Sequence, residues 1–245
     1  MKIDELFCNT LKAIEHELKL DQPLWQRKLS TASEFCRALV ACGYLSEEQM
    51  LRAAQRYRLG MSRDGGVIFW QIDEHEALHD GKIMYYHPDC HRDHDRKPSW
   101  VNYHLRRSGL LPEFCKPEHC LFGLHLLKNE KMKELKNEKI VAVVESEKTA
   151  VIMSEVKPEY IWVASGGKTE LNVARLKPLA GHKVILFPDT DETGETYREW
   201  FDIAEAAADV YGRPFTVSSI LEQRATKAQK AAKIDIVDLL FQNHP

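Results

Sequence analysis

The sequence predicts an α/β protein, in which a parallel sheet with flanking helices follows a small α+β region and N-terminal helices. The strongest observation is a set of short, uninterrupted apolar runs in the last hundred residues, at Ile140–Val144, Tyr160–Ala164 and Lys183–Phe187. Such runs suit strands that are buried on both faces of a parallel sheet. Two further observations are a change of apolar period near residue 67, from helical to strand-like, and helix-capping patterns before that point.

The first sixty residues are predicted to be helical. Thr31–Glu34 and Ser46–Gln49 both fit a capping box, in which side chains at each end bind free backbone N–H groups. Gly43 and Gly60 then stand where helices commonly end. The opening segment, residues 1–18, alternates charged and apolar residues, so we expect an amphipathic helix there and not a signal peptide.

The middle of the chain predicts an antiparallel hairpin. Its strands are Val67–Asp73 and Lys82–His87, separated by a polar turn that ends at Asp80-Gly81. The nearly all-polar segment 128–139 marks a boundary. We therefore expect three parts, which are an N-terminal helical region (1–56), an α+β subdomain (57–137) and an α/β domain (138–245).

Helical patterns separate the three apolar runs and imply right-handed crossovers. They cover Glu147–Glu155, Glu170–Leu179 and Glu195–Val210. Pro214–Ser218 adds a further candidate strand. The chain then continues with a predicted charged helix, Glu222–Lys233, and an apolar tail, Ile234–Phe241, to which the sequence assigns no role.

Composition limits the class of protein. With 245 residues and 44% hydrophobic content, the chain can build a sizeable core. A net charge of -3 argues against a protein that coats polyanions, although an acidic metal site and a basic groove can cancel in this sum. No stretch approaches the roughly 18 apolar residues needed to span a bilayer. Six scattered cysteines without a secretion signal favour reduced thiols, so we expect a cytoplasmic protein with no membrane partner.

Polar residues with metal- and phosphate-binding chemistry follow all three predicted strands. Glu145 follows the first strand, Gly166, Gly167 and Lys168 come just after the second, and Asp189 and Asp191 follow the third. Ligands of parallel sheets bind at the carboxyl ends of strands, so these residues should meet at one edge. Each acid alone is better explained as a helix cap or as part of a solvated turn. Together, the three acids favour an Mg²⁺ or Mn²⁺ site that could orient a phosphate, which the glycine backbone and Lys168 could approach.

The motifs VAVVESEKTA, a glycine turn and VILFPDTDETG resemble the Toprim fold, a Rossmann-like fold shared by DnaG-type primases, topoisomerases and some nucleases. In that family the glutamate acts in acid/base catalysis or metal binding, and the Asp-x-Asp pair holds Mg²⁺. The resemblance gives these roles to Glu145, Asp189 and Asp191. Where primases usually have Glu-Gly and then Asp, this chain has Glu145-Ser146 and then Thr149, and Lys148 adds a nearby cation that we include among the catalytic candidates.

The likeness extends upstream to the N-terminal subdomain of a primase catalytic core. The motifs occur in the same order, at Tyr57–Gly60, the hairpin, Pro98–Asn102 and Leu121–Leu124. The resemblance spans roughly residues 57 to 210 and is greatest to Toprim proteins of bacterial mobile elements and plasmids. No zinc-ribbon module is recognised before this core and no helicase motor after it, which argues against autonomous primer synthesis.

The segment 87–107 alternates basic and aromatic side chains, which suits single-stranded nucleic acid. The candidate contacts are Arg92, Arg96, Lys97, Trp100, Arg106 and Arg107. Acidic residues dilute this charge, so a solvated loop is the alternative. Two other patterns resemble known binding motifs, but neither is interpreted as one. Gly167-Lys168-Thr169 is no P-loop, because Trp162 stands where that motif needs glycine. The clusters 90–94 and 115–120 could together supply four zinc ligands, but zinc is not expected. The first cluster lacks a usual Cys-x-x-Cys spacing, and apolar surroundings can bury free cysteines without a metal.

The expected function is Mg²⁺-dependent phosphoryl or nucleotidyl transfer on nucleic acid, of the kind that makes primers on DNA during replication of a bacterial or mobile element. The implied partners are single-stranded DNA or another nucleic acid, nucleotide triphosphates, and a helicase or replication protein. The alternatives are a Toprim-type nuclease and a non-catalytic nucleic-acid-binding module that kept the fold.

Overall fold

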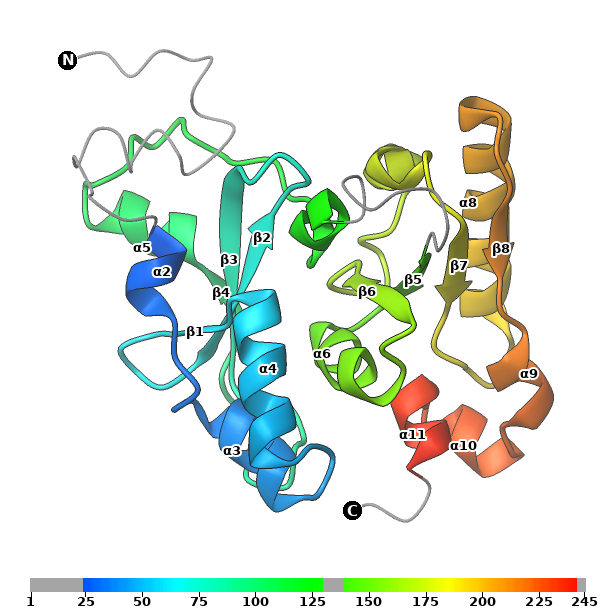
Figure 1. Ribbon diagram of the computed structural model, residues 1–245, viewed down its shortest axis with the longest axis horizontal. Helices are drawn as coiled ribbons and strands as arrows, with labels where there is room; N and C mark the ends of the chain where they lie inside the picture. Colours follow the sequence, from blue (N-terminus) through cyan, green and yellow to red (C-terminus); the bar gives the residue numbers. More distant parts are fainter. Residues whose placement is uncertain (1–23, 130–138, 242–245) are drawn as a thin grey trace. The chain divides into compact units, whose positions relative to one another are not determined.

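The structure is a computed structural model that describes residues 24–129 and 139–241 (Figure 1). The amphipathic helix expected at the N-terminus and most of the charged segment 128–139 lie outside the described residues. The chain divides into two compact units, with the boundary between Cys120 and Leu121. The expected three-part division stays a prediction.

The first unit is built on a four-stranded antiparallel sheet in the order β1-β2-β3-β4. Its strands are β1 (Gly60–Met61), β2 (Val67–Ile72), β3 (Leu78–Met84) and β4 (Ser99–Trp100). Its helices are α2 (Leu24–Lys28), α3 (Glu34–Ala41), α4 (Glu47–Tyr57) and α5 (Val101–Arg107). Strand β2 is buried along its whole length, and Phe69 and Trp70 have no exposed surface.

The predicted hairpin forms, but its turn lies earlier than expected. The turn falls between Ile72 and Leu78, and Gly81 is inside β3, directly opposite Trp70. A Cβ atom added at Gly81 would lie 2.6 Å from Cε3 of Trp70, so only glycine lets the two strands approach here. Asp80, also expected in the turn, is fully buried and accepts hydrogen bonds, as described below.

The N-terminal helices form with partly different caps. Ser46 caps α4 through the predicted capping box. Helix α3 is capped by Ser33 and not by Thr31, because its first helical residue comes later than the pattern suggested. Gly60 does not end a helix; it pairs with Ile68 in the sheet, and α4 ends through Arg58 in the left-handed conformation.

The second unit contains a four-stranded, fully parallel sheet in the order β6-β5-β7-β8. The strands are β5 (Ile140–Val144), β6 (Tyr160–Ala164), β7 (Val184–Phe187) and β8 (Phe215–Val217). The longer helices are α6 (Glu147–Val156) and α8 (Glu195–Tyr211), and the shorter ones are η2 (Leu124–Asn129), α7 (Val173–Leu176), η3 (Lys177–Leu179), α9 (Ile220–Arg224), α10 (Lys227–Ala231) and α11 (Ile236–Leu240). The predicted α/β fold with a parallel sheet is confirmed.

Two predicted helices of this unit are shorter or divided. The helix expected over Glu170–Leu179 starts only at Val173, where Asn172 caps it, and continues as a short 3₁₀ turn. The charged helix expected over Glu222–Lys233 is two helices, α9 and α10. Extended backbone at Ala225 ends the first, and a capping box at Thr226 begins the second.

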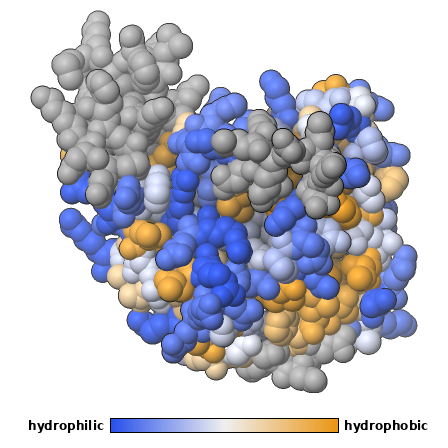
Figure 2. Space-filling view, viewed as in Figure 1, coloured by the Kyte–Doolittle hydropathy of each residue, from blue (hydrophilic) through white to orange (hydrophobic). Residues whose placement is uncertain are grey.

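On the face drawn in Figure 2, hydrophilic residues predominate and apolar residues form smaller areas. Within residues 24–129 and 139–241, no helix combines the length and the apolar character needed to cross a membrane.

Candidate metal-dependent active site

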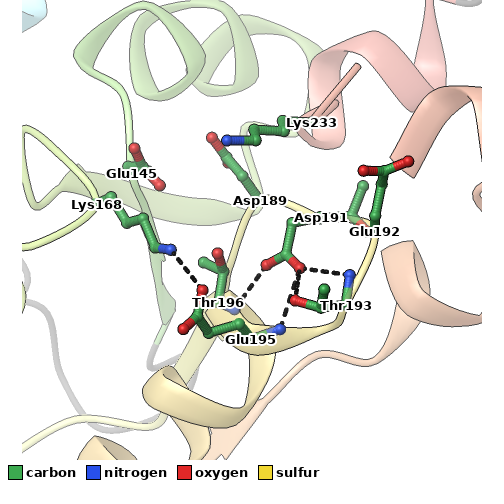
Figure 3. Close-up of a pocket in the computed structure, with 10 residues that line it drawn as sticks. Glu145, Lys168, Asp189, Asp191, Glu192, Thr193, Glu195, Thr196 and Lys233 are labelled. Atoms are coloured by element: carbon green, nitrogen blue, oxygen red, sulfur yellow. Dashed lines mark hydrogen bonds and ion pairs between the residues drawn. The ribbon is translucent and has the colours of Figure 1, made fainter. Parts of the chain in front are cut away.

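Three strand ends bring the predicted acidic residues to one edge of the parallel sheet. Val144, at the end of β5, is in register with Ala164 of β6 and Phe187 of β7, so the residues that follow leave the sheet on the same side. They border a cavity of about 440 Å³, shown in Figure 3. The lining residues are Glu145, Lys168, Asp189, Thr190, Asp191, Glu192, Thr193, Glu195, Thr196 and Lys233.

Asp191 is held as a fixed anion by the start of α8. Its Oδ1 accepts the N–H groups of Thr193 (2.8 Å) and Glu195 (3.1 Å) and the Thr193 hydroxyl (2.8 Å), while Oδ2 accepts the N–H of Thr196 (2.7 Å). Burial opposes ionisation, but these hydrogen bonds outweigh it and hold the pKa of Asp191 well below its usual range. Asp191 also lines the cavity, so a cation there could bind its carboxylate as a further partner.

Asp189 has the opposite character. Burial raises its pKa well above the usual value, and the neighbouring carboxylates of Asp235, Glu145 and Asp238 raise it further. Lys148 acts in the opposite sense. Burial and the neighbouring carboxylates therefore favour the protonated form of Asp189, and a divalent cation at this edge would favour the ionised form instead.

Lys168 is the member of the predicted phosphate-binding set that lines the cavity. Its Nζ donates to Oε2 of Glu195 at 3.4 Å (Figure 3). The same Nζ lies 4.0 Å from Glu199, which, like Glu195, is on α8. Gly166 and Gly167 form the turn between β6 and Lys168. Gly166 has a φ of 91°, and its N–H donates to the carbonyl of Glu145 at 2.9 Å, which fastens the end of β6 to the end of β5.

Sequence reasoning missed Asp235. This side chain is almost fully buried, and its Oδ2 accepts the hydroxyl of Thr149, the residue that stands where primases usually have an aspartate. Its Oδ1 caps α11 by accepting the N–H of Asp238 at 2.9 Å. The sequence offered little signal for this placement, because Asp235 lies in the predicted apolar tail and is 86 residues from Thr149.

The carboxylates surround the cavity without forming a ready-made cluster. Among the described residues, no three His, Cys, Asp or Glu side chains are already arranged around a common metal position. The donor chemistry nevertheless fits Mg²⁺ or Mn²⁺, since Glu145, Asp189 and Asp191 offer hard oxygen ligands at one edge, where the crowded carboxylates repel one another unless a cation is bound.

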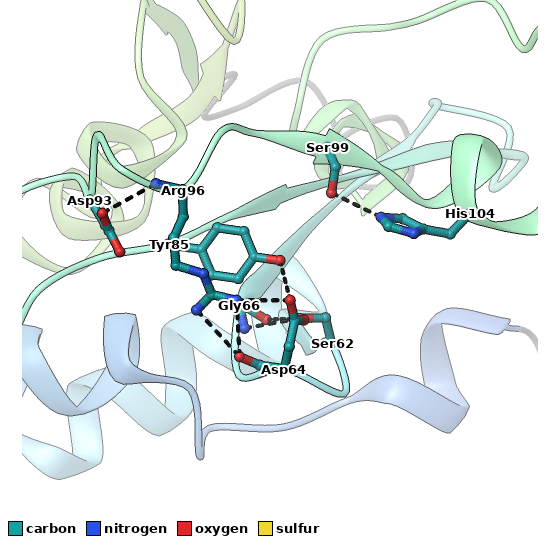
Figure 4. Close-up of polar contacts among 8 residues, drawn as sticks. All are labelled: Ser62, Asp64, Gly66, Tyr85, Asp93, Arg96, Ser99 and His104. Carbon is teal, nitrogen blue, oxygen red and sulfur yellow. Dashed lines mark hydrogen bonds and ion pairs between the residues drawn. The ribbon is translucent and has the colours of Figure 1, made fainter. Parts of the chain in front are cut away.

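Arg96, one of the predicted nucleic-acid contacts, is engaged within the first unit (Figure 4). Its Nη2 donates to Oδ2 of Asp64 at 2.8 Å, and its guanidinium lies 3.4 Å from the ring centroid of Tyr85. The Tyr85 hydroxyl donates to the same oxygen of Asp64 at 2.7 Å. The charge of Arg96 is thus largely balanced by the protein itself.

The other predicted contacts divide into exposed and engaged side chains. Arg92 and Lys97 are exposed. Arg107 is exposed and donates to the hydroxyl of Tyr103 at 3.1 Å. The side chain of Arg106 is only 20% exposed. Trp100 stacks on His119, with ring centroids 3.8 Å apart.

The Trp100–His119 stack rests on a buried polar network. Nε2 of His119 lies 3.2 Å from Oδ2 of Asp80, which has no exposed surface. Asp80 also accepts both the N–H and the side-chain amide of Asn102. A buried carboxylate needs such partners, so we assign this network to the stability of the first unit.

The fold is that of a primase catalytic core. The chain is similar to a solved structure of the DnaG catalytic core, with a TM-score of 0.53 and 16% identity over 95% of this chain and 83% of that one. It is also similar to a DnaG primase catalytic domain bound to single-stranded DNA, with a TM-score of 0.52 and 16% identity over 95% and 81% of the two chains. At such low identity, the likeness establishes the fold.

No curated protein matches the sequence. A family model described as "Domain of unknown function (DUF6371)" matches residues 33–190, which is more than half of the chain. The chain therefore belongs to this family, whose members are described as having a domain of unknown function.

Proposed function

We propose that this protein is a divalent-metal-dependent enzyme that transfers phosphoryl or nucleotidyl groups on nucleic acid, in the manner of a primase. The observation that carries the proposal is the single cavity bordered by Glu145, Asp189 and Asp191 at the carboxyl edge of a parallel sheet. Its volume of about 440 Å³ is within the range usual for small-ligand sites. The fold shared with DnaG catalytic cores supports a primase-like function for this cavity.

The residues divide the work as their environments suggest. Asp191, ionised and held by four hydrogen bonds, would supply a fixed ligand oxygen, and Asp189, whose pKa is raised in the metal-free protein, would bind a cation in its ionised form. A bound Mg²⁺ would orient a phosphate and neutralise the charge that develops on it. Glu145, which lines the same cavity, would act as a further ligand or as the base that accepts a proton from the attacking hydroxyl. Lys148 and Lys168 offset negative charge from the protein and the substrate.

The nucleotide and the nucleic acid complete the proposal. Lys168 and Lys233 both line the acidic cavity, and they would contact the phosphates of a nucleotide triphosphate. The exposed side chains of Arg92, Lys97 and Arg107 would contact a single-stranded template. A role in replication of a bacterial or mobile element, alongside a helicase or another replication protein, follows from the same primase-like interpretation.

Incorporation of labelled ribonucleotides on single-stranded DNA tests the proposal directly. We expect Mg²⁺- or Mn²⁺-dependent incorporation by the wild-type chain and its loss in Asp189→Asn. The matched control is Asp202→Asn, which makes the same chemical change at an exposed position of α8 outside the cavity lining and should retain activity. Absence of incorporation with every metal and template would reject primer synthesis.

Two alternative outcomes identify other functions of the same fold. Metal-dependent cleavage of nucleic acid without nucleotide triphosphates would identify a nuclease. A non-catalytic binding module is favoured by Thr149, because this residue replaces a usual primase acid and uses its hydroxyl to bind Asp235. Such a module would bind single-stranded DNA, and its binding would be indifferent to Asp189→Asn.

A further inference from the structure

Thr190, the residue between the two aspartates, is fastened to the C-terminal segment, which we define as residues 219–240. Only 1% of Thr190 is exposed. Its N–H donates to the carbonyl of Ile234 at 3.1 Å, and its hydroxyl donates to Oε1 of Glu222 at 2.9 Å. Both acceptors belong to the C-terminal segment, so this segment holds the middle of the Asp-x-Asp sequence by main chain and by side chain.

Glu222 is in turn held in place by a charge partner. Its second oxygen, Oε2, forms an ion pair with Nζ of Lys230, and the two side chains are only 21% and 22% exposed. A Cβ atom added at Gly194 would lie 3.7 Å from the same Oε2. Glu222 therefore borders both ends of the turn between Thr190 and Gly194, on which Asp191 lies.

The C-terminal segment also reaches the cavity and helix α6. Lys233 lines the cavity and has a φ of 55°, a left-handed conformation that is uncommon outside glycine. Two residues later, Asp235 accepts the hydroxyl of Thr149 on α6. The C-terminal segment therefore forms hydrogen bonds both to the Asp-x-Asp turn that follows β7 and to helix α6.

We propose that Glu222, oriented by Lys230, is a positioning residue that sets the carboxylates of Asp189 and Asp191 for cation binding through its hydrogen bond to Thr190. This inference rests on the proposed function, because it concerns the same metal site. Thr190 is the immediate neighbour of both aspartates, so a rotation of its backbone displaces both carboxylates at once. Such a rotation would break the hydrogen bond from the buried Thr190 hydroxyl, and the ion pair with Lys230 keeps Glu222 from moving with it.

The test compares point variants of the full chain. Thr190→Val removes the hydroxyl and keeps the side-chain shape, whereas Thr190→Ser keeps a hydroxyl that can restore the hydrogen bond. Glu222→Gln keeps an acceptor oxygen and removes the ion pair with Lys230. The control is Glu76→Gln, which breaks an ion pair of 2.5 Å with Arg58 in the other unit.

Two measurements are made on each variant. The first is hydrogen–deuterium exchange of the amides of residues 189–196 in metal-free protein, and the second is Mn²⁺ affinity by calorimetry. In Thr190→Val we expect faster exchange in these residues and about tenfold weaker Mn²⁺ binding, the loss typical of one hydrogen bond to a charged acceptor. Glu222→Gln should change both in the same direction, and Thr190→Ser and Glu76→Gln should resemble the wild type.

The outcomes separate this inference from the proposed function. Unchanged exchange in both Thr190→Val and Glu222→Gln overturns the positioning role. So does faster exchange with unchanged Mn²⁺ affinity. If the wild type binds no Mn²⁺, the proposed metal site is rejected and, with it, the claim that Glu222 sets that site.

Discussion

Replacement of Asp191 tests whether its carboxylate organises the turn that leads into α8. Gly194, the N-cap residue of this helix, has no side chain with which to bind the first N–H groups. Asp191 takes over that task for the N–H groups of Glu195 and Thr196. Asp191→Asn keeps one acceptor oxygen but places an amide nitrogen, which cannot accept, at the other.

The expected magnitude follows from burial. Thr193 and Glu195 are exposed, so water can replace part of their bonding, whereas Thr196 is 4% exposed and its N–H is out of reach of water. The one amide oxygen left by Asp191→Asn cannot accept from both sides, so at least one hydrogen bond is lost. Loss of one hydrogen bond to a charged acceptor costs about 1.5–3 kcal/mol, and loss of a negative charge at a helix N-terminus adds about 0.5 kcal/mol. We therefore expect Asp191→Asn to lower the free energy of unfolding by about 2–3.5 kcal/mol.

Urea denaturation of metal-free protein, followed by circular dichroism, measures this change. The folded-state pKa of Asp191 is depressed, so its contribution is present above the unfolded pKa of about 3.9 and is lost as the pH falls through the lower folded value. The difference between wild type and Asp191→Asn should persist from neutral pH to about pH 4 and shrink below it. Equal stability of the two proteins at pH 7 would refute the role assigned to this carboxylate.

Three further predictions concern charge and packing. Because the folded-state pKa of Asp189 is raised, metal-free protein should lose stability as the pH rises from the unfolded-state pKa through the folded-state pKa. Denaturation curves of Asp189→Asn across that pH range should not show this loss. Over the same rise in pH, calorimetry should show tighter Mg²⁺ binding by the wild type. Gly81→Ala should lower the free energy of unfolding by about 1–3 kcal/mol, because the new methyl group would overlap the ring of Trp70, and an unchanged urea midpoint would contradict this packing. Lys97→Ala should reduce the slope of log affinity for single-stranded DNA against log salt concentration by about 0.7, the value expected for one phosphate contact. Arg96→Ala should leave this slope unchanged, because Asp64 already balances the charge of Arg96. Equal slopes for the two variants in a fluorescence titration would count against the distinction.

The sequence by itself predicted the α/β fold and the edge at which the acidic residues gather. Buried parallel strands leave a local signal, since each must be apolar on both faces, and the residue after each strand is then placed by the sheet. For this reason Glu145, Asp189 and Asp191 could be grouped before any coordinates were known. The turn of the hairpin was placed too late, because Asp80-Gly81 has the composition of a turn but is used inside β3, where Gly81 admits Trp70.

Only the tertiary structure decided how these acids differ from one another. Asp189 and Asp191 are the same residue type two positions apart, yet one is crowded by carboxylates and the other is held by four hydrogen bonds. Asp235 contributes to this difference, and Glu222 holds the turn between the two aspartates. Both residues belong to the C-terminal segment, to which the sequence assigned no role. Side-chain hydrogen bonds between elements far apart in the chain have no sequence period, so they become visible only when folding brings the partners together.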